Sequence, residues 1–139
     1  MIPALIILSL LCVAGIQGKT DVIQTPSIIW KNMGESAEMT CHHMFDDSYF
    51  QMYWYRQHRG ESMRLIVFTT TSSKDFGDFK EDKYSTVKTV AQNGSFTVKS
   101  LDADDSGTYF CSVSKHSVTD LHCRFLILSE GSLMLPPDS

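Results

Sequence analysis

Apolar and polar residues alternate in several short runs between Val22 and Val113. In a β-strand, successive side chains point to opposite faces, so a period of two predicts strands with one buried face. Turn residues separate the runs every 8–12 positions or so, which predicts an all-β, two-sheet sandwich. The side chains expected in its core are Ala37, Met39, Cys41, Met52, Trp54, Phe96, Val98, Tyr109, Cys111 and Val113.

Three segments have the composition of turns, namely Asn32-Met33-Gly34, His58-Arg59-Gly60 and Asn93-Gly94. Glycine and asparagine favour turns because they tolerate a positive φ. No segment sustains a period of 3.6 residues, so helices of at most a turn or two are expected.

The N-terminal segment has the composition of an export signal. Residues 2–16 carry no charge, small residues follow at Ala14, Gly15 and Gly18, and the first charge is Lys19. We therefore expect a secretory signal peptide over residues 1–18, cleaved near Gly15 or Gly18. A short membrane anchor is the alternative, although a spanning helix needs about 20 apolar residues.

Export would change both the number of cysteines in the mature chain and the redox environment in which they lie. Removal of the signal peptide takes away Cys12 and leaves Cys41, Cys111 and Cys123 in an oxidising compartment. Three cysteines cannot all pair within one chain, so one of them is left over.

Composition and charge exclude several functions. An apolar fraction of 42% and a charged fraction of 20% are ordinary for a globular domain, and a net charge of −4 argues against nucleic-acid binding. Adjacent His42 and His43 would point to opposite faces of a strand and could not chelate one metal ion. The sequence also lacks a Gly-x-Ser-x-Gly motif, a phosphate-binding loop and a spaced Cys-x-x-Cys pair. We expect no catalysis, no metal and no cofactor.

A set of residues at fixed spacings is specific for one protein family when its members are considered together. Trp54 follows Cys41 by 13 residues, Cys111 follows Cys41 by 70, and the run before Cys111 reads Asp-Ser-Gly-Thr-Tyr-Phe. With these spacings the chain resembles the immunoglobulin V-set, and within it the T-cell receptor β chain variable region. The segments that carry the resemblance are Asp-Val-Ile-Gln-Thr-Pro (21–26), Met-Tyr-Trp-Tyr-Arg-Gln (52–57), Met-Arg-Leu-Ile (63–66) and Thr-Tyr-Phe-Cys-Ser-Val-Ser (108–114).

The resemblance implies a V-type Greek-key sandwich over residues 19–115. It implies a disulfide between Cys41 and Cys111 that joins the two sheets, with Trp54 packed in the core beside it. Tyr109 would form a tyrosine corner, and we expect Asp105 to pair with Lys83 as a surface ion pair.

The resemblance also implies two binding surfaces. Loops at residues 44–50, 69–74 and after Ser112 would contact antigen; the alternative is that the first two are merely solvated turns. The antigen-binding candidates are Phe45, Asp46, Asp47, Tyr49, Thr69, Thr70, Thr71 and Lys115. An outward sheet face with exposed aromatic side chains would meet a partner domain; the alternative is a lightly covered face of a monomer. Its candidates are Tyr55, Gln57, Met63 and Phe110.

A member of this family would recognise peptide–MHC at the plasma membrane, paired with a T-cell receptor α variable domain and anchored by a constant region outside this chain. A stand-alone secreted or innate V-set protein is the second interpretation, and an antibody light-chain segment is the third. Asn93-Gly94-Ser95 is also an N-glycosylation sequon, so Asn93 is a candidate glycan site.

Residues 116–139 depart from the family pattern because they lack the Phe-Gly-x-Gly motif that opens the last strand. His116-Ser117-Val118 fits translation of the recombination heptamer CACAGTG, so we interpret this tail as read-through from an unrearranged V segment. That origin would also account for Cys123. The alternative is a genuine tail in which residues 125–128 supply the missing strand.

Overall fold

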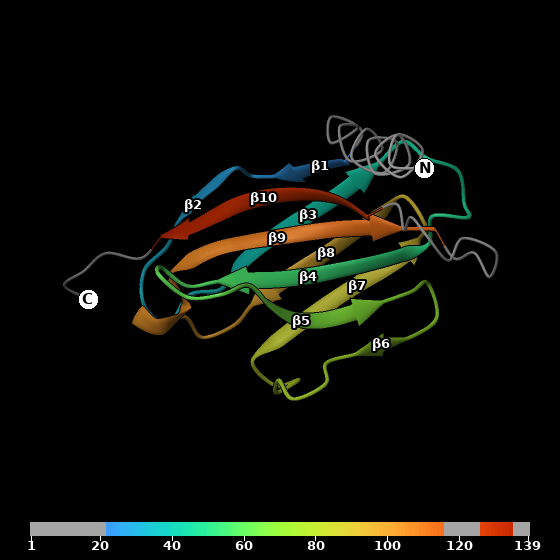
Figure 1. Ribbon diagram of the computed structural model, residues 1–139. Helices are drawn as coiled ribbons and strands as arrows, with labels where there is room; N and C mark the ends of the chain where they lie inside the picture. Colours follow the sequence, from blue (N-terminus) through green and yellow to red (C-terminus); the bar gives the residue numbers. More distant parts are fainter. Residues whose placement is uncertain (1–21, 116–125, 135–139) are drawn as a thin grey trace, which may run out of the picture.

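The computed structural model describes residues 22–115 and 126–134, which form two β-sheets packed face to face (Figure 1). The predictions for the signal peptide and for Cys12 and Cys123 fall outside these residues. The four-stranded sheet has the order β1-β3-β8-β7, and the six-stranded sheet has the order β2-β10-β9-β4-β5-β6. The strands are β1 (Val22–Thr25), β2 (Ile28–Trp30), β3 (Ala37–His43), β4 (Gln51–Gln57), β5 (Arg64–Thr69), β6 (Lys74–Asp75), β7 (Tyr84–Val90), β8 (Asn93–Val98), β9 (Gly107–Ser114) and β10 (Leu126–Met134).

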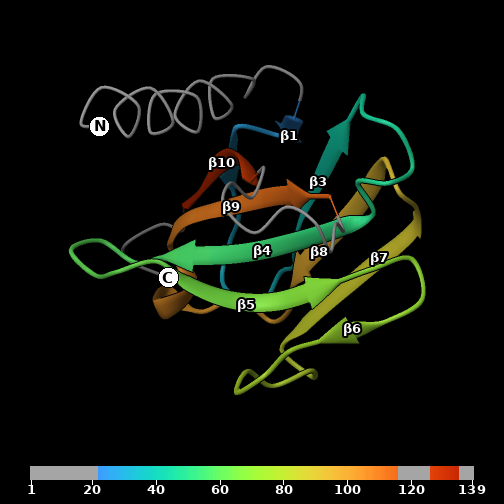
Figure 2. The same cartoon turned by 45° about the vertical axis from the view of Figure 1, so that its right-hand side comes forward.

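This architecture confirms the expected all-β fold of the V-type. Strands β5 and β6 extend the larger sheet beyond β4, and β6 forms its outer edge (Figure 2). Within the described residues, the one helical element is a 3₁₀ turn at Ala103–Asp105, which agrees with the absence of helical periodicity in the sequence.

The alternating pattern correctly predicted the core. Every side chain expected there is at most 2% exposed, and Trp54 and Phe96 stack with their ring centroids 5.2 Å apart. A disulfide between Cys41 and Cys111 joins β3 in one sheet to β9 in the other. Trp54 lies opposite Cys111 in the β4–β9 ladder, so the aromatic core and the disulfide occupy the same central layer.

Two of the three predicted turns are confirmed. Gly34 and Gly60 adopt φ values of 84° and 78°, in the left-handed region that favours glycine. The third prediction is wrong, because Asn93 and Gly94 begin strand β8 and the β7–β8 turn is made by Ala91 and Gln92. Gly94 is needed for space instead, since a Cβ atom there would collide with the sulfur of Met52.

Strand β10 completes the larger sheet. It pairs antiparallel with β9 from Leu126↔Ser114 to Leu133↔Gly107, and parallel with β2 from Ser132↔Ile28 to Met134↔Trp30. Residues 126–134 therefore occupy the position of the last strand without a Phe-Gly-x-Gly motif. Whether their codons are read-through of flanking DNA is a separate question, and the recombination hypothesis stays a prediction.

Gln24 lies at the junction of β1, β9 and β10. Its side-chain amide donates to the carbonyl of Tyr109 (3.2 Å) and its carbonyl accepts from the backbone N–H of Cys111 (3.1 Å). A Cβ atom on Gly131 would lie 2.7 Å from the Gln24 Nε2 atom and 3.1 Å from the backbone oxygen of Pro26. The close approach of β10 to this amide thus requires glycine at position 131.

Candidate functional site

The loops that join β3 to β4 (44–50) and β5 to β6 (70–73) lie at one end of the sandwich (Figures 1 and 2). Strand β9 ends there at Ser114, so exposed Lys115 belongs to the same end. The remainder of the third predicted loop lies outside the described residues. The β7–β8 turn also reaches this end and contacts the first loop, a contribution that the sequence analysis missed.

The first loop is built on a small aromatic cluster. Phe45 and Tyr49 stack with ring centroids 4.6 Å apart, and Phe45 lies 5.5 Å from the ring of His43. Asp46 caps the loop by accepting hydrogen bonds from the backbone N–H and the hydroxyl of Ser48, which hold the pKa of the Asp46 carboxyl below its usual value. The loop is therefore ordered by its own side chains, with Asp46 and Asp47 exposed on its surface.

His43 anchors this loop to the β7–β8 turn. Its Nδ1 atom accepts from the backbone N–H of Phe45 (3.2 Å), so the ring proton lies on Nε2 and is donated to the carbonyl of Ala91 (2.8 Å). The ring is fully buried, and this burial lowers its pKa below the ordinary value of histidine. Gln92 adds two further bonds, because its side-chain amide donates to the Phe45 carbonyl and to Asp47 Oδ1.

The second loop is rich in hydroxyl groups. Thr70 organises it: its Oγ1 atom accepts from the backbone N–H of Ser73 (3.1 Å) and lies 2.8 Å from Ser73 Oγ. Thr71 is exposed. Thr69 differs from the expectation, because it ends β5, is 1% exposed and donates its hydroxyl to the carbonyl of Met52. Its hydroxyl is consequently not free for a ligand.

The second predicted surface is the outer face of the larger sheet. Tyr53 and Tyr55 stack at 6.3 Å, and each tyrosine hydroxyl lies 2.9 Å from a serine of β9, namely Ser114 for Tyr53 and Ser112 for Tyr55. Burial raises the pKa of the Tyr55 hydroxyl, so this phenol is neutral at physiological pH. The hydroxyls of both tyrosines are paired within the sheet, which lets this face be covered without leaving them unsatisfied.

The candidate residues of this face differ in exposure. Met63 is 40% exposed, and Tyr55 and Gln57 are half-buried. Phe110 is only 6% exposed, so the expectation that it is an exposed aromatic is wrong. It lies in the middle of the sheet, opposite Tyr55 on β4 and Glu130 on β10, where strands flank it on both sides.

The opposite end of the domain carries the tyrosine corner. The Tyr109 hydroxyl donates to the carbonyl of Asp105 (2.7 Å), and the Asp105 carboxylate lies 2.7 Å from Lys83 Nζ. The expected ion pair is thus present, but it is not a surface pair, since the Asp105 side chain is 4% exposed. Its burial gives this pair a larger structural role than the sequence suggested.

The described residues contain no cluster of three or more His, Cys, Asp or Glu side chains able to hold a metal ion. His42 and His43 lie on opposite faces of β3, as predicted: His42 contacts Asn93 Oδ1 on the outer face, whereas His43 is buried. No helix in the described part of the chain has the length and apolar character needed to cross a membrane.

Comparison with known proteins agrees with this geometry. The immunoglobulin V-set domain model matches residues 24–125. Human T cell receptor beta variable 2 is 31% identical over 96 residues, which cover 68% of this chain and 82% of that protein. The mouse T-cell receptor beta chain V region LB2 is 30% identical over 109 residues, covering 77% of this chain and 78% of that protein.

A solved structure gives the same fold. The described fold superposes on one chain of this structure with a TM-score of 0.75. That structure concerns the structural basis of T cell specificity and activation by the bacterial superantigen toxic shock syndrome toxin-1. Its sequence is 23% identical, and the match covers 83% of this chain and 98% of that chain.

The two-sheet sandwich, its central disulfide and its loop-bearing end define an immunoglobulin-type binding domain, and the chain belongs to the immunoglobulin V-set family. Its relatives include T-cell receptor β variable regions, so it is an antigen-receptor variable domain and not an enzyme.

Proposed function

We propose that this domain is the β-type variable domain of a T-cell receptor, which recognises peptide–MHC on the extracellular side of the plasma membrane. It would reach the membrane through the secretory pathway and be anchored there by a constant region. The observation that carries the proposal is the placement of two ordered loops at one end of the sandwich, next to a sheet face whose tyrosine hydroxyls are already paired.

The loop end has the chemistry of a paratope. Phe45 and Tyr49 offer rigid aromatic surface, whereas Asp46, Asp47 and Thr71 offer exposed polar groups. Binding loops of this family combine such rigid aromatic anchors with adaptable polar contacts. Because the first loop is held by His43 and Gln92, little conformational entropy would be lost when it meets a ligand.

The outer face of the larger sheet suits an α variable domain as its partner. Tyr53, Tyr55 and Phe68 form a connected aromatic surface, and exposed Met63 and Leu65 lie beside it on or next to β5. Aromatic residues and methionine are enriched at protein interfaces. The outer face of the smaller sheet instead carries the sequon residue Asn93, and a glycan there would keep that face in solvent.

Pairing can be tested by co-expression with an α variable domain, with complex formation measured by size-exclusion chromatography. Tyr55→Arg should abolish the heterodimer because it places a charge in the buried interface. Thr97→Arg, on the outer face of the smaller sheet, is the matched control and should leave the complex intact. Equal behaviour of the two variants would contradict the proposed pairing face.

A stand-alone V-set protein is the second candidate. The observation that favours it is β10, because residues 126–134 of this chain close the sandwich without a joined segment. Sequencing of transcripts that contain the codons for Cys41 to Cys111 separates the two. Diverse junctions after Ser114 leading into Phe-Gly-x-Gly and a constant domain support the receptor, whereas one invariant transcript through Ser139 supports the stand-alone protein.

A further inference from the structure

Lys88 is a buried cation without an acidic partner. It lies on β7, is 9% exposed, and donates from Nζ to the carbonyl oxygens of Val90 (3.1 Å) and Ala91 (2.5 Å). None of the ion pairs in the described part of the chain includes it. An ammonium group has three N–H donors, so one is left without a protein acceptor among the described residues.

An unpaired buried charge destabilises a fold, because the group loses its hydration and gains too little in return. Burial accordingly lowers the pKa of Lys88 to about 8, so the ammonium is still the main form at neutral pH. The neighbouring His43 shares the Ala91 carbonyl and is neutral, and it offers Lys88 no negative charge. Among the described residues, Lys88 therefore has two carbonyl acceptors but no carboxylate partner.

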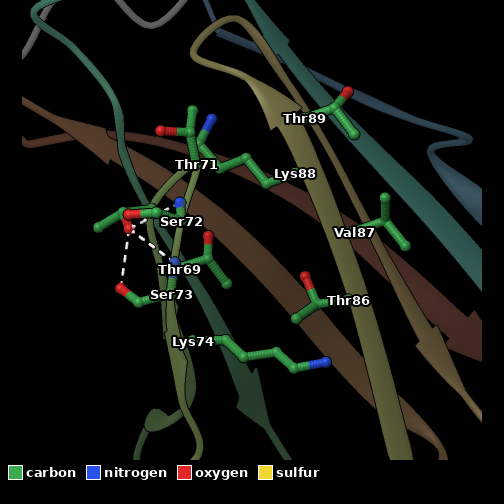
Figure 3. Close-up of a pocket in the computed structure, with 10 residues that line it drawn as sticks. Thr69, Thr71, Ser72, Ser73, Lys74, Thr86, Val87, Lys88 and Thr89 are labelled. Carbon is green, nitrogen blue, oxygen red and sulfur yellow. Dashed lines mark hydrogen bonds between the residues drawn. The ribbon is translucent and has the colours of Figure 1, made fainter.

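Lys88 lines a cleft of about 290 Å³ between β7 and the second loop (Figure 3). Lys88 extends from β7 toward the loop, and Lys74 reaches from the loop side toward β7. Hydroxyl-bearing side chains make up most of the remaining wall, and no Asp or Glu lines it; these residues are Thr69, Thr70, Thr71, Ser72, Ser73, Thr86 and Thr89. Two cations and several hydroxyl groups therefore line this space, and of these hydroxyls those of Thr69 and Thr86 already donate to backbone carbonyls.

We propose that this cleft is a subsite for an acidic side chain, Asp or Glu, of the protein ligand, with Lys88 as the charge partner of its carboxylate. Lys74 would add long-range attraction, and exposed hydroxyls such as that of Thr71 would donate hydrogen bonds to the second carboxylate oxygen. The proposal rests on the proposed function only in requiring a protein ligand at this end of the domain.

A carboxylate fits better than a larger anion because Lys88 has a single donor to spare. A phosphate group offers more acceptor oxygens than one remaining N–H and a rim of hydroxyls would satisfy, and phosphate sites usually present arginine or backbone N–H groups. In this cleft the cations are two lysines. The geometry therefore suits one carboxylate on a flexible stem.

The test uses small probes, so it does not depend on identification of the ligand. The ¹⁵N-labelled protein is titrated with N-acetyl-glutamate methylamide while amide chemical shifts are recorded, with N-acetyl-glutamine methylamide and inorganic phosphate as parallel probes. We expect saturable shifts at residues 69–74 and 86–89 with the glutamate probe. The uncharged glutamine probe should bind about tenfold more weakly, the loss expected when a charge-assisted bond is removed.

Lys88→Met should lower the affinity for the glutamate probe to that for the glutamine probe, and Thr71→Val should lower the affinity for the glutamate probe by a smaller factor. Lys80→Met, which removes an exposed lysine outside the cleft, is the matched control and should change nothing. The proposal is overturned if the glutamine probe binds equally well, if phosphate binds more tightly, or if Lys88→Met has no effect. Since no MHC is used, failure of peptide–MHC recognition would leave this result standing.

Discussion

The hydroxyl group of Tyr109 donates a hydrogen bond to the backbone carbonyl of Asp105, 2.7 Å away, inside the closed end of the sandwich. The same Asp105 holds Lys83 through its carboxylate and accepts a hydrogen bond from the backbone N–H of Asp102. One short 3₁₀ turn thus joins strand β9 to the start of β7 through buried polar contacts. Because the Tyr109 hydroxyl and the Asp105 carboxylate are buried, removal of the partner of either group should leave an unsatisfied buried atom behind.

Tyr109→Phe should lower the free energy of unfolding by about 1 to 2 kcal/mol, since it deletes one buried hydrogen bond and keeps the ring. Urea denaturation followed by tryptophan fluorescence measures the change. Tyr49→Phe is the control, because the Tyr49 hydroxyl makes no hydrogen bond to the described residues, and it should leave stability unchanged. A Tyr109→Phe protein as stable as the parent would show that the tyrosine corner contributes nothing.

Asp105→Asn should destabilise the domain by about 1 to 3 kcal/mol, because it removes the buried and nearer of the two carboxylates beside Lys83 while preserving side-chain size, and leaves only the exposed Asp102 as an acidic partner. Exposed Asp104, the preceding residue of the same turn, supplies the matched control Asp104→Asn, for which we expect no measurable change. Thermal unfolding measures the stability of both variants. An equal loss of stability in Asp105→Asn and Asp104→Asn would contradict a structural role for the Asp105–Lys83 ion pair.

Gly131→Ala should destabilise the domain by about 1 to 3 kcal/mol, because the added Cβ atom would press on the Gln24 amide and on backbone at Pro26. Half-buried Ser132 is adjacent on β10, and Ser132→Ala should have a much smaller effect. Denaturant unfolding of the full chain compares them. If Gly131→Ala is silent, residues 126–134 do not form the last strand in solution, which would favour the interpretation of the tail as read-through.

Lys88→Met should stabilise the domain at pH 7 by about 1 kcal/mol, because it replaces a buried charge that has no acidic partner with an apolar chain of similar length. The pKa of Lys88 is about 8 in the folded protein, against an ordinary lysine value of 10.5. Between these values the unfolded chain binds more protons, so the stability of the parent protein rises with pH. The difference in free energy of unfolding between Lys88→Met and the parent protein should therefore become smaller from about pH 8 upward. Unfolding curves at pH 7 and pH 10 measure this difference. An equal difference at both pH values would contradict a lowered pKa of Lys88.

The fold was predictable because its signals are local or strictly spaced. Alternation identified the inward residues of β3, β4, β8 and β9, and the spacing of Cys41, Trp54 and Cys111 identified how the sheets are joined. The prediction of a turn at Asn93-Gly94 failed because a glycine can be favoured either by a positive φ or by a close approach of neighbouring atoms. Position 94 requires space beside Met52 rather than a positive φ, and that need depends on a strand distant in sequence.

The candidate site was only partly predictable, because exposure and pairing depend on neighbours from other strands. Alternation placed Phe110 outward but could not show that flanking strands bury it. Thr69 looked like a loop hydroxyl, yet it bonds to Met52 across the β4–β5 pair. Lys88 carried no sequence signal, since its lack of an acidic partner is a property of the folded arrangement alone.

Strand β2 runs parallel to β10, and their three register pairs connect the second described strand to the last. In a parallel pair the two chain directions coincide, so tension between Ile28 and Met134 pulls the strands along their axes in opposite senses. The backbone hydrogen bonds of this pair would then be loaded together in shear, and could not open one after another. We therefore expect the β2–β10 pair to be the part of this sheet that resists stretching between Ile28 and Met134.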